Sequence, residues 1–283
     1  MTAGPKPPAN EAQIDVWNTT LGAVWTEFQA QLDRQIEPLG LEAMRVLAPR
    51  TGERILDIGC GCGQTSAELA VRVGASGVVV GADVSAPMLE VARGRAMPSG
   101  APRPLFRRID AQTGDLGHHG FDAAFSRFGV MFFSDPVAAF KNIHGALKTG
   151  GRVTFVCWRP FAENLWMRAP LEAALPLLPP LPAHDPIAPG PFAFGDASRI
   201  RSILSAAGFG SIEIDPFDAP VGGADLDQTL KLTFRIGPLG AALREHPDRV
   251  DPVRETVRAA LVPFQTPNGV FMPAAVWVVQ ARA

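Results

Sequence analysis

Residues 55–64 of this 283-residue chain read Ile55-Leu56-Asp57-Ile58-Gly59-Cys60-Gly61-Cys62-Gly63-Gln64 and contain the strongest indication of its fold. An apolar run ends in an acid, three glycines follow at alternate positions, and a helical pattern begins directly after them. Glycine adopts positive φ angles and lets another group approach the backbone closely. A helix that begins there presents unpaired N–H groups and the positive end of its dipole, which suit a carboxylate or a phosphate. The stretch therefore predicts a strand, a ligand-binding loop and a helix.

Strands and helices alternate around and after this stretch. Apolar runs predict strands at Arg54–Ile58, Gly77–Ala82, Leu105–Ile109, Phe121–Ser126 and Arg152–Cys157. Helical periodicity predicts helices between them at Gln64–Val73, Ala86–Arg93 and Pro136–Lys148. Ser85 is the expected N-cap of the second helix with Pro87 in its first turn, and Gly150 and Gly151 are expected to end the third. This alternation implies right-handed crossovers and a Rossmann-like, doubly wound α/β fold with a mainly parallel sheet.

The segments on either side of this core have patterns of their own. The spacing of apolar residues over Glu11–Leu47 predicts two helices, with Pro38 as the expected break. Eight prolines within residues 161–194 predict an ordered wrap over the sheet edge without long regular elements. The rest of the chain is expected to form a helix, a strand, a mostly helical insertion and an antiparallel last strand. These lie at Ala197–Ala207, Ser211–Ile214, Leu226–Val262 and Ala274–Ala281.

The charge distribution favours a small-molecule partner over nucleic acid. The formal net charge is -2, and a basic group at Arg103, Arg107 and Arg108 is followed at once by Asp110 and Asp115. Sequence-independent binding of nucleic acid needs several unopposed phosphate contacts. We therefore expect no nucleic-acid partner.

The N-terminus, the hydropathy and the cysteines bear on the compartment. Residues 1–10 are polar and proline-rich and lack the layout of a signal peptide, so we expect a flexible leader. No apolar run reaches the roughly 18 residues of a membrane helix. The three cysteines, Cys60, Cys62 and Cys157, form no disulfide framework. A cytoplasmic protein without a membrane span is the expectation. We also expect no metal site, because zinc usually needs four ligands in separated pairs.

Two further acids stand at the carboxyl ends of predicted strands, as the glycine loop does. Asp83 ends the second strand about 20 residues after the loop, the usual place for an acid that accepts hydrogen bonds from ribose hydroxyls. Asp110 ends the third strand and precedes Ala111. A dinucleotide fingerprint, G-x-G-x-x-G, would need a glycine where Gln64 or Ser66 stands. A nicotinamide-dependent oxidoreductase therefore remains only as an alternative.

The form D-x-G-x-G-x-G at Asp57–Gly63 resembles motif I of the class I S-adenosylmethionine-dependent methyltransferases. The Asp110-Ala111 pair, the run Phe121–Gly129 and the run Leu147–Arg152 resemble the later motifs in the same order. Over about residues 50–158 the chain is similar to the family that includes the ubiquinone/menaquinone C-methyltransferases, although Arg127 stands where those enzymes usually have a small polar residue. The resemblance implies S-adenosylmethionine as the cofactor. The expected cofactor-binding residues are Asp57, Gly59, Cys60, Gly61, Cys62, Asp83, Val84, Asp110, Ala111, Arg127 and Trp25.

The resemblance also implies how the chain is organised. After the leader at 1–10, we expect a single methyltransferase domain at 11–283. Within it, N-terminal helices occupy 11–50, the cofactor-binding core 51–158, and substrate-covering insertions 159–195 and 225–265.

Several aromatic residues could serve either the core or a ligand. Trp17 and Trp25 have helical spacing, and an indole face attracts a sulfonium through a cation–π interaction. Four polar or aromatic residues follow the fifth strand, at the carboxyl edge where open α/β sheets bind ligands. They are Trp158, Arg159, Asn164 and Trp166, and for each a substrate role and a structural role stay open.

Methyl transfer from a sulfonium requires chiefly that donor and nucleophile are aligned and water is excluded. A base is needed only when the nucleophile must lose a proton, and the chain contains no tyrosine to act as one. The remaining candidates are His118, His119, His144, His184, Glu163 and Asp185, and the sequence does not choose a catalytic residue among them.

The acceptor is expected to be a small, partly apolar metabolite, methylated on C, O or N. A nucleic-acid amino methyltransferase would normally carry a D/N/S-P-P-aromatic motif where Ser126-Arg127-Phe128-Gly129 stands. A non-catalytic S-adenosylmethionine-binding regulatory protein stays open as a second alternative.

Overall fold

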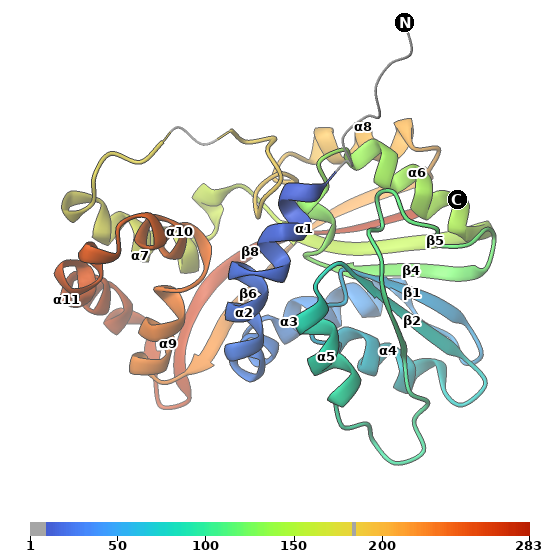
Figure 1. The fold of residues 1–283 in the computed structure, drawn as a ribbon, viewed down its shortest axis with the longest axis horizontal. Helices are drawn as coiled ribbons and strands as arrows, with labels where there is room; N and C mark the ends of the chain where they lie inside the picture. Colours follow the sequence, from blue (N-terminus) through green and yellow to red (C-terminus); the bar gives the residue numbers. More distant parts are fainter. Residues whose placement is uncertain (1–9, 183–184) are drawn as a thin grey trace, which may run out of the picture.

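The computed structural model describes residues 10–182 and 185–283, so the predicted leader lies outside the described residues except for Asn10. Its sheet has eight strands in the order β3-β2-β1-β4-β5-β8-β6, with β7 paired to β8 (Figure 1). The strands are β1 (Arg54–Ile58), β2 (Val78–Asp83), β3 (Leu105–Arg108), β4 (Phe121–Arg127), β5 (Leu147–Trp158), β6 (Gly210–Ala224), β7 (Gln265–Thr266) and β8 (Gly269–Arg282). Strands β1 to β5 run parallel, and β8 is antiparallel to β5 and β6. The predicted Rossmann-like fold with an antiparallel last strand is confirmed.

Helices cover both faces of this sheet, as its two-sided apolar strands require. In Figure 1, α3, α4 and α5 lie on one face, and α6 and α8 lie on the other. Their bounds are α3 (Gln29–Leu47), α4 (Gln64–Val73), α5 (Ala86–Gly94), α6 (Pro136–Ala146) and α8 (Ala197–Ala206). Because β1 to β5 are parallel, their carboxyl ends share one edge of the sheet. The last residues of these strands therefore meet on that edge.

The local signals in the core are mostly correct. The predicted bounds of β1 and α4 match, and the Ser85 hydroxyl caps α5 by accepting from the Met88 N–H at 3.5 Å. The expectation that Gly150 and Gly151 end a helix is wrong, because α6 already ends at Ala146. These glycines instead lie in β5 at a shift of register against β4, where Gly150 has a φ of 77°.

From residue 10 onward, where the structure describes the chain, three helices and not two precede the first strand: α1 (Glu11–Asn18), α2 (Thr20–Glu27) and α3. The chain bends at Thr19, with φ -116° and ψ -92°, and at Phe28, with φ -101° and ψ 14°. The predicted break at Pro38 is wrong. Pro38 is exposed inside α3, while Ile36 and Leu39 beside it are buried in the main core. Packing of the apolar face therefore holds the helix together across the proline.

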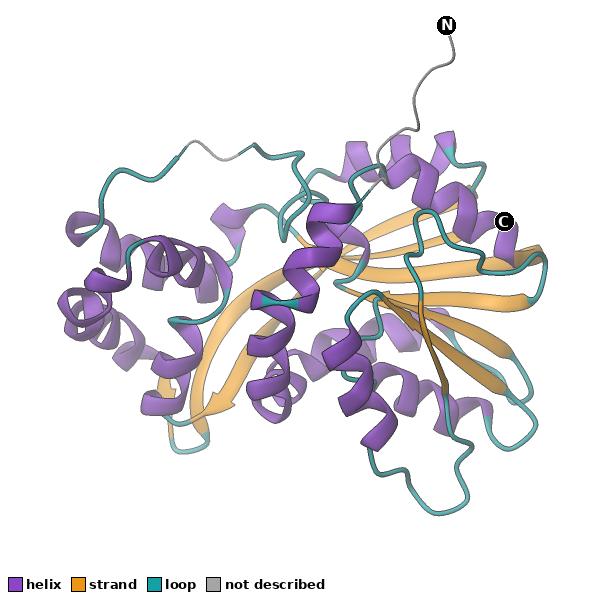
Figure 2. Cartoon of the chain, in the orientation of Figure 1, coloured by secondary structure: helices purple, strands orange, loops and turns teal. Residues whose placement is uncertain are grey.

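Strands β6 and β8 extend far beyond their predicted bounds of Ser211–Ile214 and Ala274–Ala281. Figure 2 shows them leaving the sheet as a long, curved ribbon that reaches a separate group of helices. Strand β6 contains Pro216 and Pro220, which a strand tolerates where it forms the edge of a sheet. The ribbon thus continues the sheet into the second group of helices.

We call these helices the lid helices. They are α7 (Leu165–Ala174), α9 (Leu226–Thr233), α10 (Gly237–Glu245) and α11 (Val250–Leu261). The prediction that residues 161–194 lack long regular elements is wrong at α7, which contains Pro170. Pro170 is buried, and Leu171 and Ala174 beside it join a separate apolar core formed by the lid helices and the ribbon. This core stabilises α7 despite the proline.

A third apolar cluster connects the lid helices to the N-terminal helices. Val24, Phe28 and Leu32 pack there against Leu232 of α9. No helix among the described residues is both long enough and apolar enough to cross a membrane.

Candidate active site

A cavity of about 580 Å³ lies at the carboxyl edge of the sheet. Each of the five parallel strands ends at its wall, and α1, α2, α3 and the lid helices α7 and α10 complete it. Every predicted cofactor-binding residue except Asp57 lines this cavity: Gly59, Cys60, Gly61, Cys62, Asp83, Val84, Asp110, Ala111, Arg127 and Trp25. Residues predicted from separate segments of the sequence thus lie around one cavity.

The glycine loop has the conformation that its sequence predicts. Gly59, Gly61 and Gly63 have φ angles of 64°, 52° and 80°. A Cβ on Gly59 would lie 2.7 Å from the Cα of Gly129, so only glycine lets the loop pack against the end of β4. Among the described residues, no side chain caps the N-terminus of α4. Its unpaired N–H groups are therefore available to a negatively charged group of a ligand.

Asp57 lies beneath the loop, not on the cavity wall. It is fully buried, and its Oδ2 accepts hydrogen bonds from Thr65 Oγ1 at 2.7 Å and Ser66 Oγ at 2.6 Å. Burial raises the pKa of Asp57 to about 6, against the opposing effect of these two hydrogen bonds. Asp57 thus ties β1 to the first turn of α4, and a direct contact with the cofactor stays a prediction.

Asp83 and Asp110 both line the cavity, and each also orders the backbone around it. Asp83 accepts from Gly61 N–H at 2.7 Å through Oδ2 and from Ser85 N–H at 2.8 Å through Oδ1. Asp110 Oδ1 accepts from the Gln112 N–H at 2.9 Å. Burial raises the pKa of Asp83. A carboxylate oxygen has more than one lone pair, so both acids keep capacity to accept hydrogen bonds from a ligand.

Arg127 belongs to an ion-pair network that was not predicted. Its guanidinium lies 3.7 Å from Asp33 of α3 and donates to Gln64 Oε1 at 2.6 Å, while Arg95 contacts Asp33 from outside the cavity at 2.7 Å. Burial lowers the pKa of Arg127, and the nearby Asp33 opposes that shift. The signal for Asp33 was available in the sequence, because it is an acid between Leu32 and Ile36 on the apolar side of a helix.

Cys60 and Cys62 are buried free thiols in the loop. Burial raises the pKa of Cys62 to about 12 and also raises the pKa of Cys60. Both therefore stay protonated near neutral pH. Within residues 10–182 and 185–283 there is no group of three or more His, Cys, Asp or Glu side chains that could hold a metal ion.

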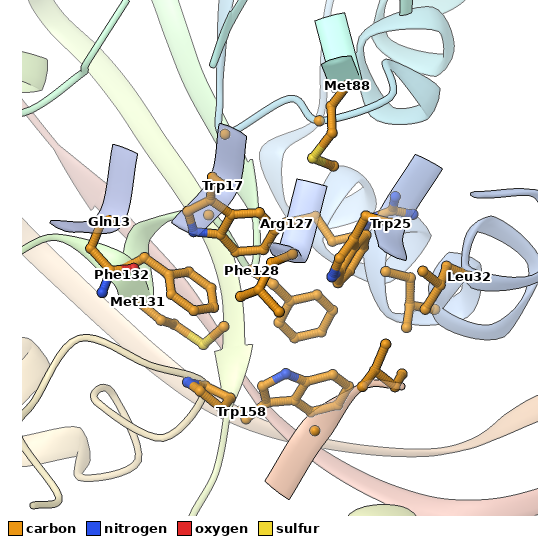
Figure 3. A pocket seen from close by; sticks show the side chains of 18 of the residues that line it. Gln13, Trp17, Trp25, Leu32, Met88, Arg127, Phe128, Met131, Phe132 and Trp158 are labelled. Carbon is orange, nitrogen blue, oxygen red and sulfur yellow. The ribbon is translucent and has the colours of Figure 1, made fainter. Parts of the chain in front are cut away.

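Aromatic side chains form the other half of the cavity (Figure 3). Trp17 packs edge-on against Phe132, with centroids 5.0 Å apart, and lies 6.1 Å from Trp25. Phe128 stacks on Trp158 with centroids 4.1 Å apart and an interplanar angle of 10°. In Figure 3, the Trp17 and Trp25 rings lie on one side of the cavity and Phe128 and Trp158 lie on the other. Of these five, Phe128 and Phe132 were not predicted as site residues.

The four residues that were predicted to follow the fifth strand divide into two groups. Trp158 and Trp166 line the cavity. Arg159 and Asn164 do not, and each has a structural role among its neighbours. Arg159 pairs with Asp218 at 2.7 Å, and Asn164 is fully buried, where it accepts from the Ala275 N–H at 3.0 Å.

The predicted base candidates that the structure describes all lie away from the cavity wall: His118, His119, His144, Glu163 and Asp185. His119 Nδ1 is 2.9 Å from the Leu147 carbonyl oxygen, His144 packs on Phe209, and Glu163 pairs with Arg159. His184 lies outside the described residues.

Known proteins resemble this chain in sequence and in fold. The methyltransferase domain family matches residues 55–151. A demethylmenaquinone methyltransferase of Clavibacter sepedonicus is 34% identical over 178 residues, which cover 60% of this chain and 70% of that protein. The aklanonic acid methyltransferase DauC of Streptomyces sp. (strain C5) is 36% identical over 118 residues. That match covers 42% of this chain and 54% of DauC, so the chain spans about half the length of that relative.

The solved structure of YcgJ from Bacillus subtilis has a TM-score of 0.56 and 20% identity, covering 86% of this chain and 97% of that protein. At this identity the likeness concerns the fold alone. Together, the fold, the glycine loop and the similarity to the Clavibacter enzyme define a class I S-adenosylmethionine-dependent methyltransferase. The chain belongs to this family, resembles its ubiquinone/menaquinone C-methyltransferase members, and has S-adenosylmethionine as its cofactor.

Proposed function

We propose that this chain transfers the methyl group of S-adenosylmethionine to a small, partly apolar acceptor, at a C, O or N atom, by in-line displacement. One observation carries the proposal. A single cavity joins the glycine loop, Asp83 and Asp110 to a half lined by aromatic side chains. A cofactor and an apolar acceptor can therefore lie in contact and away from bulk water, as methyl transfer requires.

The charged groups of the cavity suit the two ends of the cofactor. Asp83 would accept hydrogen bonds from the ribose hydroxyls, and Asp110 with Ala111 would contact the adenine. The open N-terminus of α4 and the Arg127 guanidinium would bind the carboxylate of the methionine end. When bound, the cofactor supplies a methyl group on a positively charged sulfur. Trp25 lies near Arg127 in Figure 3, where its ring would face that charge.

The composition of the other half supports an apolar acceptor. Trp17, Phe132, Phe128, Trp158 and Met131 all line it, so an acceptor with apolar surface gains free energy by leaving water. Relatives are named for the acceptors demethylmenaquinone and aklanonic acid. We extend to this chain only what those names share, a small-molecule acceptor.

The test is a calorimetric titration of the purified chain with S-adenosylmethionine, with NAD and NADP as parallel ligands. We expect saturable binding of S-adenosylmethionine alone. Asp83→Asn should weaken it at least tenfold, because the carboxylate would no longer accept from both the loop and the ribose. Asp215→Asn is the matched control, since Asp215 is exposed on β6 and does not line the cavity. Binding of only a nicotinamide cofactor would refute the proposal. So would bound S-adenosylmethionine without methyl transfer to any of a panel of apolar C, O and N acceptors.

A further inference from the structure

A second cavity, of about 310 Å³, lies at the opposite edge of the sheet from the candidate active site. Its wall is formed at the beginnings of β1, β4 and β5, at the end of β8 and at the end of α3. The two cavities share no lining residue, and none of the predicted cofactor-binding residues lines the second one. Its volume lies at the lower end of the range of small-molecule sites, about 300–1,000 Å³.

The acids on the wall of the second cavity already have basic partners. Glu53 accepts from Arg152 through both carboxylate oxygens, each at 2.8 Å. Asp122 accepts from Lys148 at 2.5 Å and from a backbone N–H of β1 at 2.8 Å. Each acid thus has one cation of its own, and these two pairs leave no net charge on the wall.

The backbone carbonyl oxygens at the end of α3 are occupied as well. Arg152 donates to the carbonyl oxygens of Leu47 at 2.7 Å and Ala48 at 3.0 Å. Gln280 donates to the carbonyl oxygen of Val46 at 2.9 Å. The last carbonyls of a helix form the negative end of its dipole, which would otherwise repel an anion. With these donors in place, the wall offers a ligand few free acceptors.

Two guanidinium groups on the same wall remain free. Arg50, between α3 and β1, and Arg282, at the end of β8, are both exposed and both line the cavity. Neither side chain forms an ion pair or hydrogen bond with any part of the chain that the structure describes. The Thr149 hydroxyl on this wall is likewise without a partner there. The groups left over are therefore donors, and two of them are positively charged.

We propose that the second cavity binds a small molecule that carries a phosphate group, held by Arg50 and Arg282 with the Thr149 hydroxyl as a further donor. A guanidinium group presents its N–H groups in a fork that matches phosphate oxygens. A phosphate monoester has about 1.5–2 negative charges near pH 7, which matches two free arginines better than the single charge of a carboxylate. The site goes beyond methyl transfer and does not depend on it, because the two cavities share no residue.

The experiment compares methyl phosphate with acetate, which differ in charge and are similarly small. Each is titrated into the purified, ¹⁵N-labelled chain in phosphate-free buffer at constant ionic strength. The backbone N–H signals of Thr149, Gly150 and Gly151 report binding, because these residues line the second cavity. We expect saturable shifts of these signals with methyl phosphate, and at least about threefold weaker binding of acetate.

A pair of double variants tests the two arginines. Arg50→Gln with Arg282→Gln should lower the affinity for methyl phosphate at least about tenfold, because both charge-assisted contacts are lost. Arg34→Gln with Arg72→Gln is the matched control. It removes the same charge from exposed positions of α3 and α4 that line neither cavity. It should change the affinity by less than about twofold, since distant exposed charges are screened by salt.

Thr149→Glu tests the same site with both arginines present. Thr149 is exposed, so the chain should fold normally, and the new carboxylate would occupy the free arginines and repel the phosphate. We expect at least about a tenfold loss of affinity here too. In every variant, unchanged N–H signals away from the cavity confirm the fold within the same spectrum.

Saturable binding that both Arg50→Gln with Arg282→Gln and Thr149→Glu abolish would support the phosphate site. The absence of any shift at residues 149–151 with methyl phosphate would overturn it. So would equal affinities for methyl phosphate and acetate. A loss of affinity in the control variant as large as in the cavity variant would reduce the effect to net charge, and would also overturn the site.

Discussion

Replacing Arg127 by methionine should separate the two ends of the cofactor site. Methionine keeps much of the length and apolar volume of the arginine side chain and removes its charge. Arg127 lies on the cavity wall 3.7 Å from Asp33, and Asp33 keeps its second partner, Arg95, at 2.7 Å. The variant therefore leaves no unpaired buried acid behind. We expect it to fold, with a change in unfolding free energy below about 2 kcal/mol, well under the cost of breaking an isolated buried pair.

The effect on binding follows from what the guanidinium would contact. A hydrogen bond to a charged group contributes about 1.5–3 kcal/mol, and about 1.4 kcal/mol corresponds to a factor of ten in affinity. Arg127→Met should therefore lower the affinity for S-adenosylhomocysteine about 10- to 150-fold. It should lower the affinity for 5′-methylthioadenosine, which lacks the amino-acid end, by less than threefold.

The assay is a pair of calorimetric titrations for each protein, and the informative quantity is the ratio of the two affinities. Arg95→Met is the matched control, because Arg95 contacts the same aspartate and does not line the cavity. It should change both affinities by similar, small factors. If Arg127→Met weakens both ligands equally, the arginine acts through the shape of the loop. If it weakens neither, Arg127 has no part in cofactor binding. Either result would contradict a contact between Arg127 and the amino-acid end of the cofactor.

Three further predictions follow from the loop, its buried acid and α3. Gly59→Ala should lower the unfolding free energy, measured by urea denaturation, by more than about 2 kcal/mol. The added Cβ would lie 2.7 Å from the Gly129 Cα, and residue 59 has a φ of 64°. An unchanged denaturation midpoint would contradict the close packing. Burial raises the pKa of Asp57 to about 6, above its unfolded value of 3.8, so the folded state binds the proton more tightly. The unfolding free energy of wild type relative to Asp57→Asn should be highest below about pH 4. It should fall by roughly 2–3 kcal/mol as the pH rises past 6. If the difference in unfolding free energy between the two proteins does not change over that range, the raised pKa of Asp57 is excluded. Pro38→Ala should raise the melting temperature, with a gain of about 1–3 kcal/mol, since it is exposed within α3 and restores a helical N–H; a lower melting temperature would show that the proline is required.

The part of the cavity wall at the glycine loop could be predicted from the sequence because its signals are local. A glycine with a positive φ, such as Gly59, and an acid at the end of a strand, such as Asp83, each depend on a few neighbouring residues. The parallel sheet then brings the strand ends together without further information. The ion pair between Asp33 and Arg127 was missed because its partners are far apart in the sequence and no local pattern links the two side chains.

The lid and the ribbon could not be predicted in the same way. Pro216 and Pro220 argue against a strand by local rules, and only the absence of a neighbour beyond β6 in the described sheet makes them acceptable. Pro38 and Pro170 likewise lie inside helices that tertiary packing stabilises. Phe128 was missed because its left-handed backbone and its stacking on Trp158 appear only in three dimensions.

The way the cavity is assembled has a consequence for how such a protein could change over time. The family match at residues 55–151 covers the strand ends that line the cavity beside the glycine loop, whereas Trp158, Trp166 and the lid residues of the cavity all lie beyond it. Substitutions in the later segments can therefore reshape the aromatic part of the cavity without disturbing the glycine loop or its acids. The ribbon of β6 and β8 reaches the lid helices from the edge of the sheet. Insertions at this edge displace no central strand. The segment with the glycine loop and its acids can stay the same while the later segments diverge.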